Sequence, residues 1–214
     1  MHFGIQNILF VILLATAAYL FSRKFRSIWR NIKLGRDKNR SDNPKERWKL
    51  MIKAAMGQSK IEIIVDGLLG THRIFAEPLG PIYNAAINFF EILAVFVIIA
   101  CLVFLWRRNV NVVARFKDLK GWAKNDGNNI LVIEIVLMTA LLLLGAAEAN
   151  MDEGKGPWLI SGLLAPLFSG ISQENLHLIE RIAWWAHIVG IMAFLNYLPY
   201  SKHFHVILAF PNVW

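Results

Sequence analysis

Four long and uninterrupted apolar blocks restrict the folds open to this chain. They cover residues 5–21, 82–106, 130–147 and 182–198. A helix of about 20 apolar residues crosses a bilayer, so each block is close to the length of one span. The blocks lack the apolar–polar alternation of membrane strands. The sequence therefore predicts an all-α integral membrane helical bundle that forms one domain over residues 1–214.

The basic residues lie where they flank the predicted spans. Of the 23 lysines and arginines, 13 fall within residues 23–60 and six within residues 107–124. Positive loops stay in the cytoplasm, and their lysines and arginines also contact anionic lipid headgroups. The net charge of +8 therefore reflects membrane orientation, and we expect no nucleic-acid partner.

This charge pattern also predicts a location and a topology. Basic residues follow the first block, so we expect a retained signal anchor, in preference to a cleaved signal peptide. We expect a multi-pass protein of the bacterial inner membrane, with the N-terminus outside and the C-terminus cytoplasmic. Residues 22–60 then form a cytoplasmic loop and residues 150–181 an external loop.

One membrane crossing is missing from this topology. Two cytoplasmic basic loops require an even number of crossings between Lys53 and Arg107, and residues 82–106 supply one. The remaining apolar stretch, residues 61–70, is short and carries Glu62 and Asp66. Ten residues with two acids do not span a bilayer alone. We expect four clear spans plus a truncated or missing fifth, with the segment absent between Lys60 and Ile61, unless the loop-charge rule is broken here.

Two histidines near the end of the chain suggest a cofactor. His187 and His205 are 18 residues apart, which is five helical turns, so a continuous helix would carry both on one face, about 27 Å apart. That spacing suits a span that ligates haem near each membrane surface, with His187 external. The small residues Ala186, Gly190 and Ala193 would leave room for a flat ring. The alternative is that both histidines are interfacial and bind water or a carbonyl.

Each of these two histidines would need a second haem ligand from another part of the chain. His72 is expected on the external side, where it could face His187, and Arg73 could pair with a haem propionate. An ordinary solvated loop is the alternative for both residues. No remaining histidine suits His205 as an inner partner, since His2 and His177 are both expected outside, and His203 points to the other side of a continuous helix. We expect one or two b-type haems, and no iron–sulfur cluster, because Cys101 is the only cysteine.

Three acidic residues lie in or at the ends of the blocks. Glu91 is the deepest, whereas Glu134 and Glu148 are expected near opposite ends of their span. Intramembrane carboxylates often relay protons, and a quinone site needs protons. A hydrogen-bonded structural role for Glu91 is the alternative. Residues 158–168 are apolar but interrupted by glycine and proline, which predicts an interfacial or re-entrant segment that could cover a site near His187.

Several stretches together resemble a known family. They are IEIIVDGLLGTHRIF, LGPIYN, the NPKERW loop and RIAWWAHIVGIMAFLNYLPYSKHFHVILAFPN. The chain resembles the membrane cytochrome b domain of nitrate reductase gamma-subunit-like and heterodisulfide-reductase-like (Fe–S)-binding oxidoreductases. The resemblance covers nearly the whole chain. It implies five helices, two b haems, and electron exchange between a quinone and cytoplasmic iron–sulfur clusters.

By the same resemblance, His187 and His205 match last-helix haem ligands and His72 matches a partner ligand. The chain departs from the family in its second helix, largely absent before Ile61, and in the cluster domain expected after Trp214.

The sequence thus predicts a membrane haem b electron-transfer module. It would link the quinone pool to a cytoplasmic iron–sulfur domain or subunit, as a component and not a complete enzyme. The alternative is a non-redox membrane anchor or assembly subunit without haem. A transporter is a third interpretation, supported only by Glu91 and the segment at residues 158–168.

Overall fold

The computed structural model describes residues 4–32, 68, 80–110, 121–151, 156 and 158–205. Within these ranges the regular structure is entirely helical, which confirms the all-α prediction. Four of the described helices are long and apolar enough to cross a membrane. They cover Ile5–Asn31, Pro81–Asn109, Lys124–Glu148 and Gln173–Tyr200. The four predicted spans are therefore confirmed, and residues 61–70 of the incomplete fifth lie outside the described residues except for Leu68.

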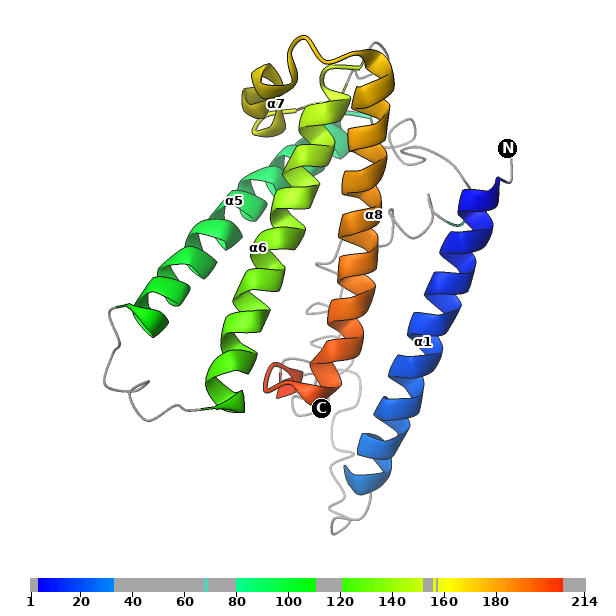
Figure 1. Cartoon of the computed structure of the whole chain (residues 1–214), viewed down its shortest axis with the longest axis vertical. Coiled ribbons are helices and arrows are strands. Elements are labelled where there is room, and N and C mark those ends of the chain that lie inside the picture. The colour runs from blue at the N-terminus through cyan, green and yellow to red at the C-terminus, as the bar shows by residue number, and fades with distance from the viewer. Residues whose placement is uncertain are drawn as a thin grey trace. The chain divides into compact units, whose positions relative to one another are not determined.

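The described residues form four long helices and three short ones, of which two are 3₁₀ helices (Figure 1). They are α1 (Ile5–Ile32), α5 (Pro81–Asn109), α6 (Trp122–Glu148), α7 (Ser161–Leu164), the 3₁₀ helix η2 (Ala165–Phe168), α8 (Gln173–Tyr197) and the 3₁₀ helix η3 (Leu198–Tyr200).

The helices extend well beyond the apolar blocks. Helix α1 continues eleven residues past residue 21, and α8 begins nine residues before residue 182. The predicted loops at residues 22–60 and 150–181 are therefore partly helical. Polar residues continue a helix into the interfacial region because their side chains reach water while the backbone keeps its own hydrogen bonds.

Much of the apolar surface of the long helices is exposed. Ile82 and Phe96 on α5 are 71% and 64% exposed, and the apolar window of α5 is only 17% buried within the protein. Apolar faces of this extent are stable only against a nonaqueous solvent. These faces therefore agree with contact to lipid acyl chains.

The chain divides into two compact units. Unit 1 comprises Met1–Phe75 and Leu195–Trp214, and unit 2 comprises Ala76–Phe194.

Aromatic side chains hold the described part of unit 1 together. Phe25 stacks on Trp29 at a ring-centroid distance of 6.0 Å, and it meets Phe204 edge to face at 6.5 Å. Lys24 Nζ lies 4.3 Å from the centroid of the Tyr200 ring, within the range of a cation–π interaction. These contacts fix the basic end of α1 to the segment that follows α8.

Helices α5 and α6 form an antiparallel hairpin in unit 2. Polar groups join the end of α5 to the start of α6: Arg108 Nη2 donates to Lys124 O at 3.0 Å, and Asn128 Nδ2 donates to Asn109 Oδ1 at 2.9 Å. Gly121, at φ 59°, precedes α6 in a left-handed conformation that favours glycine.

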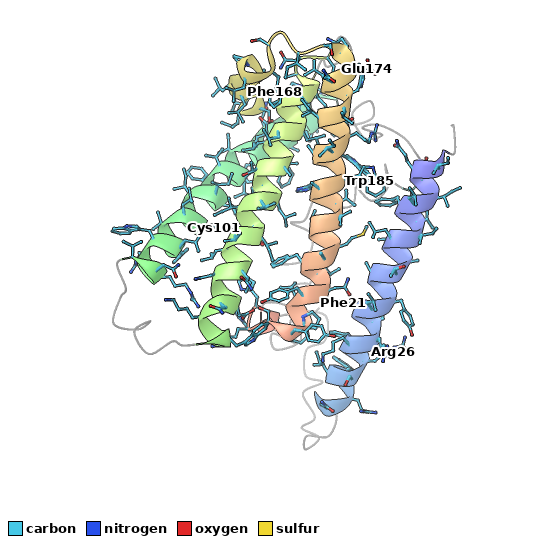
Figure 2. All side chains as sticks on the ribbon, in the orientation of Figure 1. Phe21, Arg26, Cys101, Phe168, Glu174 and Trp185 are labelled. Carbon is cyan, nitrogen blue, oxygen red and sulfur yellow. The ribbon has the colours of Figure 1, made fainter. Side chains whose placement is uncertain are left out.

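Helix α6 is the central helix of unit 2. It lies between α5 and α8 in Figure 1, and side chains of α8 contact it at Leu137. Ala146 and Ala147 near its end are fully buried, and α7 and η2 pack there. Figure 2 shows Phe168 of η2 at the same end of unit 2 as Glu174 in the first turn of α8.

Candidate functional site

His187 is a buried histidine in the middle of unit 2. It is 5% exposed, and its Nδ1 lies 2.9 Å from the carbonyl oxygen of Leu137 on α6. A carbonyl oxygen only accepts hydrogen bonds, so Nδ1 carries the proton. A neutral ring then has its lone pair on Nε2, the nitrogen that would bind a metal. Ligating histidines commonly donate their other ring N–H in this way, which holds the ring in place.

The structure pairs His187 with a residue near the middle of α6. Its partner Leu137 lies 15 residues from the start of α6 and 11 from the end, near the middle of that helix. The depth of His187 relative to the external face stays a prediction. The blocks at residues 130–147 and 182–198 mark only the most apolar parts of longer helices, so a residue near a block's edge lies well inside its helix.

Gly190 does not leave the room for a ring that the sequence suggested. A Cβ on Gly190 would lie 2.5 Å from Leu137 Cδ2, so the Leu137 side chain occupies the space beside this glycine. Ala186 and Ala193 are exposed on another face of α8. Gly190 instead allows α8 and α6 to approach closely, a common use of small residues between membrane helices.

His205 does not lie on the same helix as His187. Helix α8 ends at Tyr197, η3 follows, and Ser201 is extended with ψ 157°. Pro199 lacks a backbone N–H and cannot continue the α-helical hydrogen bonding. The prediction of two same-face histidines on one continuous helix was therefore wrong.

The local structure of His205 nevertheless assigns its tautomer. His205 is exposed, and its Nδ1 lies 2.7 Å from Lys202 O, so Nδ1 again carries the proton. The ring of His203 meets that of His205 edge to face at a centroid distance of 5.7 Å. His205 belongs to unit 1 and His187 to unit 2.

The other predicted site residues, His72 and Arg73, lie outside the described residues. The described ranges contain no group of three or more histidine, cysteine or acidic residues that could hold a metal ion. A low-spin haem needs only two axial ligands from the protein. The hydrogen bond of His187 to Leu137 O is of the kind that an axial histidine makes, whereas the space beside Gly190 is filled by Leu137.

Glu91 has a structural role that the sequence left open. Its Oε2 accepts the backbone N–H of Ile160 at 2.7 Å and of Ser161 at 3.4 Å. One turn earlier on α5, Asn88 Oδ1 accepts the N–H of Leu159 at 3.2 Å. Three successive N–H groups at the start of α7, which have no helical acceptor of their own, are thus satisfied by α5. The hydrogen-bonded alternative for Glu91 is confirmed.

The segment held by Glu91 also packs closely on α6. A Cβ on Gly145 would lie 2.5 Å from Ser161 Oγ, so the absence of a side chain at Gly145 allows Ser161 to pack against α6. Asn150 Nδ2 donates to the carbonyls of Ala146 and Ala165, each at 2.9 Å, and joins α6 to η2. Gly145 lies eight residues beyond Leu137, about 12 Å along α6. The segment at residues 158–168 therefore covers Glu91.

The remaining acids differ from one another in burial. Glu134 lies twelve residues inside α6 and is half-buried. Glu148 ends α6 and is 7% exposed.

Sequence reasoning missed the partners of Glu91. The only local signal was the pair Asn88 and Glu91, three residues apart in an apolar block. Nothing in the sequence connects that pair with Ser161, 70 residues later in the chain.

These helices define a multi-pass membrane protein. The chain is similar to the protein named "Probable iron-sulfur-binding oxidoreductase FadF" from Bacillus subtilis (strain 168), with 28% identity over 234 residues. The match covers 97% of this chain and 32% of that protein, so the chain spans about a third of the length of its relative. No family model and no solved structure matches the chain.

Proposed function

We propose that the chain is a membrane haem b electron-transfer module that links the quinone pool to an iron–sulfur domain or subunit. The single observation that carries this proposal is the state of His187. Its burial and the hydrogen bond that holds its ring to Leu137 O are features of axial histidine ligands. The module would be one component of a quinone-linked oxidoreductase.

Burial and orientation are the contributions of this chain's residues. The Leu137 carbonyl holds the His187 ring and increases the basicity of Nε2. The apolar helices around it exclude water, which tunes the potential of a bound redox group. A haem supplies one-electron redox chemistry when bound, and His187 and His205, with His72 as a partner, are the proposed ligands. Arg73 is the proposed propionate partner.

The relative supports the partners in this proposal. Its name refers to iron–sulfur binding and to an oxidoreductase, and this chain matches about a third of its length. The single cysteine here cannot hold a cluster, so the iron–sulfur group would belong to another domain or subunit. The membrane lipid, the quinone and the orientation with the N-terminus outside an inner membrane belong to the same proposal.

The length of the match supports a fifth span. The alignment runs over 234 residues, whereas this chain has 214, so the relative has at least 20 residues in the matched region that have no counterpart here. About 20 residues is the length of one transmembrane helix. A span of this length between Lys60 and Ile61 belongs to the same proposal.

The test is a dithionite-reduced minus air-oxidised absorption spectrum of the detergent-purified chain, expressed with ample haem. The native chain is expected to show the sharp α-band of a b-type haem. His187→Ala is expected to lose the band of the site that it ligates. His177→Ala is a matched control, because His177 is exposed on the same helix and should leave the spectrum unchanged.

The variant His205→Ala separates one haem from two. Partial loss of the band in each of His187→Ala and His205→Ala would indicate two sites, and complete loss in one with no change in the other would indicate one. A flat spectrum for the native chain would refute the haem proposal. That result would favour the non-redox anchor, which predicts no chromophore and tolerance of His187→Ala.

A further inference from the structure

Three exposed arginines form a stripe toward the end of α1. They are Arg23, Arg26 and Arg30, and at 3.6 residues per turn they fall within an arc of about 60° on the helix surface. Phe21, which ends the apolar block, and Arg26 lie toward the same end of α1 (Figure 2). Helix α1 contains no acidic residue, and no hydrogen bond or ion pair to another described residue engages the three guanidinium groups. This arginine stripe is therefore a charged surface without a counter-ion from the described part of the chain.

A different face of α1 packs within unit 1. Phe21, Phe25 and Trp29 stack along the helix at ring-centroid distances of 5.8 and 6.0 Å. Phe25 also meets the Phe204 ring edge to face at 6.5 Å. This aromatic face is centred about 130° around the helix from the arginine stripe. Aromatic packing therefore determines which side of α1 is covered, and it leaves the arginines at the surface.

Lys24, the fourth basic residue of α1, does not belong to the arginine stripe. It lies about 100° around the helix from Arg23. Its Nζ is 4.3 Å from the centroid of the Tyr200 ring, and the residue is half-buried, whereas the arginines are exposed. One of the four charges therefore contacts an aromatic ring, and the other three lie together on the surface.

The position of the stripe along α1 fits the headgroup layer of a bilayer. Arg23 is 18 residues from Ile5, or about 27 Å along the axis, and the hydrocarbon core of a bilayer is about 30 Å thick. From Arg23 to Arg30 the helix rises about 10 Å further, and each headgroup layer is about 5–8 Å thick. A guanidinium group donates two parallel N–H groups to a phosphate. Depth, charge and donor geometry therefore all suit the phosphate of a phospholipid.

We propose that Arg23, Arg26 and Arg30 form a binding site for the phosphate groups of anionic phospholipids. Basic residues at the end of a membrane helix attract anionic lipid. A zwitterionic headgroup carries its own cation and leaves the three charges less well neutralised. The site therefore selects anionic lipid through the arrangement of three arginines on one face, and not through the net charge of the chain alone. This lipid site goes beyond the proposed electron transfer, and it does not depend on haem.

Native mass spectrometry of the detergent-purified full chain tests the proposal. The chain is titrated with phosphatidylglycerol and, separately, with phosphatidylcholine of the same acyl chains. The native chain is expected to bind phosphatidylglycerol about fivefold more tightly or better, since each arginine near anionic lipid contributes about that factor. The variant Arg23→Gln/Arg26→Gln/Arg30→Gln should bind the two lipids equally. Its circular dichroism should match that of the native chain, because the three side chains are exposed.

Lys24→Gln is the matched control, because it removes one charge from the same helix outside the stripe. It should keep the preference for phosphatidylglycerol, whereas Arg26→Gln should reduce it. Equal binding of the two lipids by the native chain would overturn the proposal and favour an acidic segment of a partner protein as the occupant. The proposal is also overturned if the triple variant keeps the preference, or if Lys24→Gln and Arg26→Gln reduce it equally. The visible spectrum is a separate measurement, so failure of the haem proposal would be distinguishable from each of these results.

Discussion

Replacement of Gly190 by alanine should destabilise the chain, although alanine is the better helix former. The added Cβ would lie 2.5 Å from Leu137 Cδ2, against an optimal carbon–carbon distance of about 3.5–4.0 Å. Leu137 is only 4% exposed, so its side chain has little space to yield. Overpacking of this kind destabilises the folded state by about 1–3 kcal/mol, whereas the higher helix propensity of alanine stabilises it by about 1 kcal/mol. The net loss should be about 1 kcal/mol.

Reversible unfolding of the detergent-solubilised chain, followed by circular dichroism, measures this loss. Gly162→Ala is the control, since its Cβ would meet only ordinary contact, at 3.6 Å from Trp158 Cβ. Leu137→Ala removes the atom that a Cβ at position 190 would meet. The loss of stability in the double variant, Gly190→Ala with Leu137→Ala, should therefore be about 1–2 kcal/mol smaller than the sum of the two single losses. A Gly190→Ala chain at least as stable as the native one, with additive effects in the double variant, would refute the close contact between α8 and α6.

Three further predictions concern contacts at the ends of the helices. Asn109→Ala and Asn128→Ala should each lower the free energy of unfolding by about 0.5–1.5 kcal/mol, and a double-mutant cycle should show that the two effects are not additive. Lys24→Met should lower the free energy of unfolding by about 0.5–1 kcal/mol, because it removes the cation–π interaction with the Tyr200 ring. The same substitution should have no such effect in a Tyr200→Leu background. Asn150→Ala should speed hydrogen exchange in η2 and destabilise the chain by about 1–3 kcal/mol, because it removes the donor to two carbonyls; unchanged exchange would contradict this role.

The corrected position of His205 shows what apolar periodicity cannot predict. Pro199 was visible in the sequence, but whether a helix bends or ends at a proline depends on whether neighbours satisfy the freed carbonyls. Here the chain enters η3 and then an extended serine, which separates His205 from α8. Gly190 was likewise visible in the sequence. Whether the space beside a glycine stays open depends on the residue that packs against it, which here is Leu137 of another helix.

The sequence alone determined that this is a helical membrane protein and located the four spans that the described residues contain. Bilayer thickness and the need to satisfy every backbone polar group act locally along the chain, so composition and length suffice to predict such helices. Only the tertiary structure decided that Leu137 orients His187 and that Glu91 holds the start of α7. Those contacts join residues 50 and 69 positions apart, and they depend on which helix faces pack together, which local periodicity does not determine.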